Sequence, residues 1–222
     1  MLRPHFRVMK REYEPVSSLT HLIGAVLAAA GLVVLLVFSA LWATAWHVVS
    51  FALYGSSMVL LFSASAVYHF LTQRSKAKSV LRRIDHSFIF LLIAGTYTPV
   101  CLVALRGPWG WTLFGIIWGL ASVGIVLKVC DVKLSRTLST LLYICMGWLA
   151  LIALAPLSQV LSGTALFWMF LGGVFYTGGA VFYMLEQRLW IHMWGPHEVW
   201  HLFVMLGAFC HFWMMLRYVL HL

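Results

Sequence analysis

Charged residues are scarce in this chain of 222 residues. Only 9% of the residues are Asp, Glu, Lys or Arg, whereas 63% are hydrophobic and the mean hydropathy is +0.94. Soluble domains carry about 25% charged and about 45–50% apolar residues. A chain with so few polar side chains cannot cover itself with polar surface, and the composition therefore excludes an ordinary soluble domain.

The sequence also lacks a polar linker, a low-complexity stretch, an internal repeat and any C-x-x-C pair. We therefore expect a single domain over residues 1–222, with residues 1–17 forming a short basic tail. All four cysteines fall inside apolar stretches, which indicates packing residues rather than a cysteine metal site. They are Cys101, Cys130, Cys145 and Cys210.

Long runs of apolar residues make up most of the sequence. A membrane-spanning helix needs about 20 mostly apolar residues. Seven runs qualify, at residues 20–41, 46–70, 84–105, 110–130, 136–156, 163–186 and 197–219. The first run is too long for the apolar core of a signal peptide, so we interpret it as a retained helix. The sequence thus predicts an all-α membrane protein, a seven-transmembrane helix bundle.

The basic residues predict the orientation of this bundle. The net charge is +9, but the Lys and Arg residues lie between the apolar runs, so they report topology and not nucleic-acid binding. Thirteen of them fall on the side of the N-terminus and two, Arg106 and Arg217, on the other side. Since cytoplasmic segments carry the excess of Lys and Arg, we expect a cytoplasmic N-terminus and a C-terminus outside. The expected partners are membrane lipids, and the oligomeric state is open.

Ionisable residues are costly inside a membrane and tend to mark function. In this chain they gather where helices meet the predicted cytoplasmic side, and His211 is the main exception. The group comprises His21, His69, Asp85, His86, His197, Glu198 and His201. The remaining histidines, His5, His47, His192 and His221, are expected to be interfacial polar residues.

Spacing singles out three histidines as metal ligands. His197 and His201 are four residues apart and share one helical face, which suits two imidazoles on one metal ion. His69 lies at a matching depth and supplies a third ligand, as in catalytic zinc sites that keep one open position. Asp85 then suits a position outside the direct metal ligands, where it accepts a hydrogen bond from a ligand imidazole or from a metal-bound water. For His21, His86 and His211 we favour buried hydrogen-bonding roles without metal contact.

The string His197-Glu198-Val199-Trp200-His201 also matches H-E-x-x-H, the zinc protease pattern in which the glutamate is the general base. An intramembrane metalloprotease is therefore an alternative. The rest of the chain offers no second motif of that class.

At these residues the chain resembles the hemolysin III proteins of bacteria, part of the progestin and adiponectin receptor superfamily. The matching blocks fall in order along essentially the whole chain. They are Ser18-Leu19-Thr20-His21-Leu22-Ile23-Gly24-Ala25, Ser65-Ala66-Val67-Tyr68-His69, Arg83-Ile84-Asp85-His86, Ala94-Gly95-Thr96-Tyr97-Thr98-Pro99, His197-Glu198-Val199-Trp200-His201 and Cys210-His211-Phe212. One departure is His86, where receptor members carry a tyrosine.

This resemblance implies seven helices with a cytoplasmic N-terminus, in a bacterial inner (plasma) membrane. It also implies a zinc ion held by His69, His197 and His201, with Asp85 and Ser65 around the fourth, water-bearing position. In such a site Asp85 could act as general base and Ser65 could hydrogen-bond the water or a developing oxyanion.

Two hypotheses of different class follow from this site. The first is a zinc-dependent hydrolase of a lipid amide or ester, a linkage found near the headgroup boundary. The second is a non-catalytic sensor or regulator of the membrane with a structural zinc. Pore formation, which the family name suggests, is disfavoured because the charged residues collect at one end of the helices, whereas a conducting path needs polar lining along its depth.

Overall fold

The computed structural model describes residues 14–72, 74–185 and 195–222 and is all-helical there. Its elements are α1 (Pro15–Trp42), α2 (Ala45–Phe70), α3 (Lys78–Pro99), the π-helix η1 (Val100–Ala104), α4 (Pro108–Val129), α5 (Arg136–Gly147), the 3₁₀ helix η2 (Trp148–Ala153), α6 (Leu154–Val160), α7 (Gly163–Leu185), α8 (Pro196–Arg217) and the 3₁₀ helix η3 (Val219–His221). Among the described residues, seven helical segments are long and apolar enough to cross a membrane. The predicted seven-helix membrane fold is therefore confirmed.

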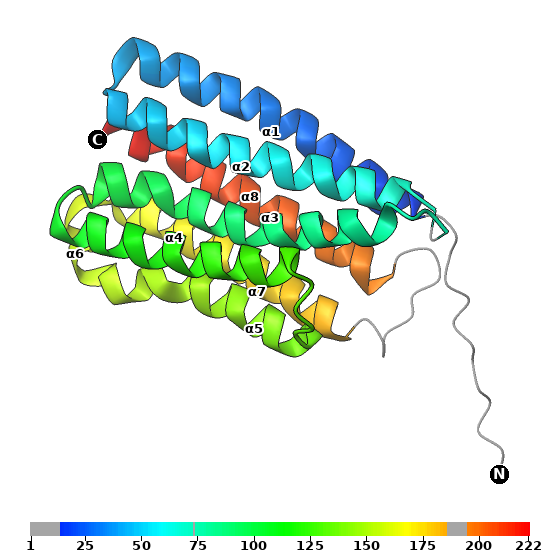
Figure 1. Ribbon diagram of the computed structural model, residues 1–222. Helices are drawn as coiled ribbons and strands as arrows, with labels where there is room; N and C mark the ends of the chain where they lie inside the picture. The colour runs from blue at the N-terminus through cyan, green and yellow to red at the C-terminus, as the bar shows by residue number, and fades with distance from the viewer. Residues whose placement is uncertain (1–13, 73, 186–194) are drawn as a thin grey trace.

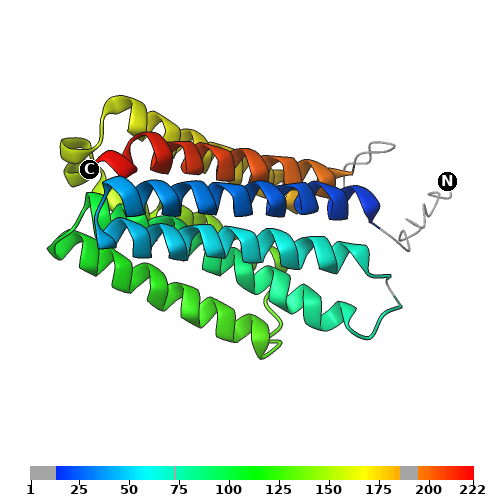
Figure 2. The ribbon, with the colours of Figure 1, turned by 90° about the horizontal axis from the view of Figure 1, so that it is seen from above.

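The helices run roughly along one common axis and form a bundle (Figure 1). α1 pairs with α2, α7 pairs with α8, and α3 packs between α2 and α4. The start of α1 and the C-terminus lie at opposite ends, as Figure 2 shows from above. The end that holds the starts of α1, α3, α5 and α8 also carries Lys78, Arg82, Arg83, Lys128 and Arg136, and we call it the basic end.

Two helices begin earlier than the apolar runs predict. α1 starts at Pro15 and α3 at Lys78, five and six residues before the predicted starts at 20 and 84. The extra turn of α3 is polar but firmly bonded, because the Lys78 ammonium donates to the carbonyls of Tyr68 (2.8 Å) and Leu71 (3.0 Å) at the end of α2. Hydropathy finds the apolar part of a helix and misses such a polar extension.

The fifth span is not one regular helix. α5 ends at Gly147 and a 3₁₀ segment follows. The Tyr97 hydroxyl lies at the break, where it donates to the Gly147 carbonyl (2.7 Å) and accepts from the Ala150 amide (2.8 Å). A side chain that inserts into the backbone hydrogen bonds of a helix is a known cause of such irregularity. No sequence pattern predicts this insertion. Pro99, inside the third apolar run, predicts a local distortion, since proline leaves a carbonyl without its usual donor. The structure has this distortion as the π-helix η1.

The turn into α4 depends on one glycine. Gly107 has φ +141°, a value that side chains disfavour, and Pro108 then opens the helix. This sequence order, glycine before an N-terminal proline, allows the very short connection between η1 and α4.

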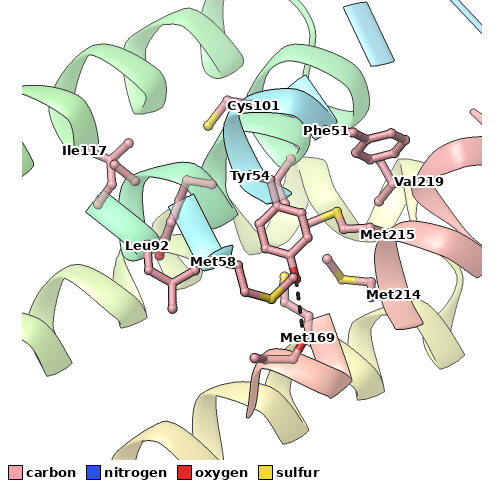
Figure 3. Packing of buried hydrophobic residues seen from close by; sticks show 14 of the residues in the cluster. Phe51, Tyr54, Met58, Leu92, Cys101, Ile117, Met169, Met214, Met215 and Val219 are labelled. Carbon is pink, nitrogen blue, oxygen red and sulfur yellow. Dashed lines mark hydrogen bonds between the residues drawn. The ribbon is translucent and has the colours of Figure 1, made fainter. Parts of the chain in front are cut away.

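Sulfur-rich packing fills the interior away from the basic end. Four buried methionines, Met58, Met169, Met214 and Met215, meet from α2, α7 and α8 around the Tyr54 ring (Figure 3). Met is unbranched and polarizable, so it fills irregular gaps between helices. This core supports the deep wall of the site described below.

One histidine expected at the interface is buried. His47, at the opposite end from the basic residues, is 4% exposed. Its Nε2 donates to the Val219 carbonyl (3.2 Å) and its Nδ1 pairs with Thr44 (2.9 Å). The interfacial prediction is therefore wrong for His47, because the C-terminal segment folds over it. His221 is exposed as expected, and His5 and His192 lie outside the described residues.

Candidate metal centre

Three histidines converge at the basic end of the bundle. His69 is the last residue but one of α2, and His197 and His201 occupy the first two turns of α8. One nitrogen from each lies within 4.8 Å of the other two, and the Nε2 atoms of His69 and His197 are 3.2 Å apart. Two nitrogens on one tetrahedral zinc ion lie about 3.4 Å apart, given bonds of about 2.0–2.1 Å. The trio predicted from spacing is thus brought together and could hold a metal ion.

Hydrogen bonds on the far ring nitrogens orient two of the imidazoles. His69 Nδ1 donates to a Glu14 carboxylate oxygen at 2.6 Å, and His201 Nδ1 donates to the Ser17 carbonyl at 3.2 Å. In a neutral imidazole the other nitrogen, Nε2, then carries the lone pair. Metal-ligating histidines usually have such a partner, which fixes the tautomer and the ring orientation. The donor set therefore fits a metal ion such as zinc.

Glu14, just before α1, was not among the predicted site residues. Its carboxylate is held between His69 and the Lys78 ammonium, whose Nζ lies 3.5 Å away. Burial alone would raise the pKa of Glu14, but the hydrogen bond from His69 and the nearby positive charge outweigh burial and lower the pKa to about 2. Glu14 thus stays ionised and supplies a negative charge behind a ligand imidazole.

Asp85 and Ser65 lie beside the triad. Both are buried, Asp85 at 8% and Ser65 at 2% exposure. Their side chains interact with each other, and Asp85 is within electrostatic range of His69. Both line the same cavity as the three histidines. The structure thus brings Asp85 and Ser65 together with the three histidines, as the sequence predicted.

Three further ionisable residues of the predicted group lie near the triad: His21, His86 and Glu198. His86 lines the cavity and is partly buried. His21 is buried as predicted, but the predicted hydrogen-bonding role is wrong, because neither ring nitrogen has a hydrogen-bond partner among the described residues. Its ring instead stacks on the His201 ring, with centroids 3.6 Å apart and planes at 7°. Glu198 is buried, but it does not line the cavity that His197 and His201 line. Its carboxylate instead folds toward the start of α8, where a negative charge is favoured by the helix dipole, and a Cβ at Gly195 would lie 2.7 Å from its Oε2. This position disfavours Glu198 as the base of a zinc protease.

A large cavity extends from the triad into the bundle. Its volume is about 800 Å³, and its walls come mainly from α3, α5, α7 and α8. At the basic end it is lined by exposed cations, including Lys133 and Arg136, so it reaches the surface there. Deeper in, its walls are mostly apolar and include Ile144, Phe170 and Met214. A charged mouth above an apolar interior suits an amphiphile with a polar head and a hydrocarbon chain.

Comparison with known proteins agrees with these features. A family model described as Haemolysin-III related matches residues 9–212. The chain is 43% identical over 205 residues to the hemolysin-3 homolog of Bacillus subtilis (strain 168), which covers 92% of this chain and 93% of that protein. It is 42% identical over 207 residues to hemolysin-3 of Bacillus cereus, covering 93% and 92% of the two chains. A more distant similarity, 25% over 181 residues, links it to the human monocyte to macrophage differentiation factor, with 78% and 72% covered.

Proposed function

The chain belongs to the Haemolysin-III related family of membrane proteins, and from this premise we propose that it is a zinc-dependent hydrolase of a lipid amide or ester. The observation that carries the proposal is one continuous cavity that contains the three histidines, Asp85 and Ser65 together. A bound zinc ion would supply a Lewis acid and lower the pKa of water to about 7.

The residues of this chain have separate tasks in such a reaction. His69, His197 and His201 would hold the ion, and Glu14 would keep His69 in the required tautomer. Asp85 would take the proton from the attacking water, and Ser65 would hydrogen-bond the developing negative oxygen. Both side chains are buried, and charges interact more strongly in a buried setting than in bulk water.

The depth of the site supports a lipid linkage as the substrate. His69 and His197 lie at the ends of their membrane-spanning helices. We propose that these ends lie near the boundary between hydrocarbon and headgroups, which is where amide and ester bonds of lipids lie. We further propose that the basic end faces the cytoplasm, in the inner membrane of a bacterium, because cytoplasmic segments carry the excess of Lys and Arg.

A paired substitution tests the catalytic role. Asp85→Asn should lower hydrolysis of acyl amide and ester probes by about 100-fold or more, the usual contribution of a general base, while the zinc content stays at the wild-type value. Glu198→Gln, which makes the same carboxylate-to-amide change outside the cavity, should keep its activity. Full activity in Asp85→Asn would reject the assigned role, and loss of activity in Glu198→Gln alone would revive the protease interpretation.

A second candidate is a non-catalytic regulator in which zinc fastens helices together. One observation favours it: α1 packs against both α2 and α8, and the three histidines of α2 and α8 converge beside its start, so a shared ion would tie α2 to α8 at the basic end. This candidate predicts that zinc removal lowers the melting temperature, while no lipid species accumulates in cells that lack the protein. Lipid profiling of a deletion strain separates the two candidates.

A further inference from the structure

The deep part of the cavity holds a histidine that the metal centre does not use. His211 follows His201 by ten residues on α8, about 15 Å further along the helix axis. Its Nε2–H donates to the Met169 carbonyl of α7 at 3.1 Å. The neutral ring therefore carries a lone pair on Nδ1, and this buried atom has no hydrogen-bond partner among residues 14–72, 74–185 and 195–222.

A second unsatisfied polar atom lies beside it. The hydroxyl group of Tyr176, on α7, is buried and also has no partner in the described part of the chain. The rings of Tyr176 and His211 are 5.5 Å apart at 51°, and both residues line the cavity. Two polar side chains, His211 and Tyr176, thus line the deep, mostly apolar part of the cavity, and His211 lies about 15 Å along α8 from His201.

Two glycines make room for this pair. A Cβ at Gly172 would lie 2.5 Å from His211 Nε2, and a Cβ at Gly207 would lie 2.9 Å from the Tyr176 ring. Glycine on α7 thus admits the histidine of α8, and glycine on α8 admits the tyrosine of α7. A purely structural role explains the hydrogen bond from His211 to Met169. It does not explain why His211 Nδ1 and the Tyr176 hydroxyl are buried without a hydrogen-bond partner among the described residues.

Buried polar groups are almost always hydrogen-bonded, because leaving them unpaired is costly. His211 Nδ1 needs a donor, and the Tyr176 hydroxyl can both donate and accept. A single hydroxyl group meets both needs at once. We infer that His211 and Tyr176 form a subsite for a hydroxyl group carried part-way along the acyl chain of an amphiphile. The inference rests on the proposed function only for the placement of the ligand head at the triad.

Competition binding with two fatty acids tests this subsite. Ricinoleic acid and oleic acid have the same chain length and double bond, and they differ by one mid-chain hydroxyl group. The zinc-loaded full-length protein in nanodiscs should bind ricinoleic acid about fivefold to tenfold more tightly, the effect of one well-formed hydrogen bond. In Tyr176→Phe the affinity for ricinoleic acid should fall to that for oleic acid, which should be unchanged. Tyr218→Phe, outside the cavity lining, is the matched control and should keep the wild-type preference.

Equal affinities in the wild-type protein would overturn the inference and assign the two polar atoms to a buried water, while leaving the hydrolase proposal intact. A preference that survives in Tyr176→Phe and in His211→Phe would also overturn it, since the hydroxyl would then bind elsewhere. Failure of both acids to bind would reject the subsite together with the lipid-binding cavity, and only this outcome counts against the proposed function.

Discussion

Around the triad, single side chains decide whether the imidazoles can serve as ligands. Neither His69 nor His201 is oriented by its own helix alone. The Glu14 carboxylate and the Ser17 carbonyl, both at the start of α1, accept hydrogen bonds from their Nδ1–H groups and leave Nε2 available. Residues at the start of α1 therefore orient candidate ligands that come from α2 and α8.

Substitution of Glu14 tests most directly how a single residue affects metal binding. Glu14→Gln keeps the size of the side chain but removes the negative charge behind His69, so zinc affinity should fall about 10-fold to 100-fold, as for other outer partners of metal ligands. Competition with a chelating dye measures this affinity. Glu198→Gln is the control, because Glu198 lies outside the cavity lining, and it should bind zinc as the wild type does. A wild-type affinity in Glu14→Gln would show that the carboxylate has no part in metal binding.

The sequence predicted the three ligands but not their partners. Two histidines four residues apart on one helix are a local pattern, and a third at matching depth completes it. Glu14 lies in a polar stretch before the first apolar run, and no spacing relates it to His69, which is 55 residues away. Only the packing of α1 against α2 brings the two side chains together.

At the scale of helices, close packing depends on which glycines face a neighbour. The pattern Gly115-x-x-x-Gly119 predicts that helices approach closely, yet a Cβ at either glycine would meet nothing within 4 Å. Gly124, on the same helix α4, does face α3, and a Cβ there would lie 2.5 Å from the Phe90 ring. Within the bundle the Gly-x-x-x-Gly pair therefore makes no close helix contact, since the motif marks small residues and not the side of the helix that a neighbour covers. The same close approach is predicted for Gly172, Gly173, Gly178 and Gly179 of α7. Gly172, Gly178 and Gly179 do meet α8 closely, and a Cβ at Gly173 would lie in ordinary contact with Trp148 of η2, at 3.4 Å.

Alanine substitutions on α4 test this difference. Gly124→Ala should destabilise the protein by about 1–3 kcal/mol, because the new methyl group overlaps the buried Phe90 ring. Gly115→Ala should be neutral or stabilising by up to about 1 kcal/mol, because alanine favours a helix and its methyl group enters open space. Thermal unfolding in detergent measures both. Equal effects of the two substitutions would contradict the packing of α4 against α3.

For the whole molecule, composition was sufficient to predict the seven spans, since each membrane helix must be apolar along its length. The cavity could not be predicted, because it depends on how far α3, α5, α7 and α8 stand apart. The break in the fifth span was equally hidden, since it depends on Tyr97 of a different helix.

The orientation of the bundle remains a prediction that reporter fusions can test. A phosphatase that folds only outside the cytoplasm should be active when fused after Leu222 and inactive when fused after Lys133, because the first point follows seven spans and the second follows four. The reverse pattern of activity would place the basic end outside and exclude the proposed cytoplasmic metal site.

The central claim is that three histidines from two helices hold one zinc ion. Metal analysis of the protein, purified without a histidine tag, measures this directly. We predict about one zinc per chain in the wild type and in His221→Ala, whose histidine is exposed at the opposite end, and almost none in folded His69→Ala, His197→Ala or His201→Ala. Wild-type zinc content in the three variants, or no zinc in the wild-type protein, would contradict the account.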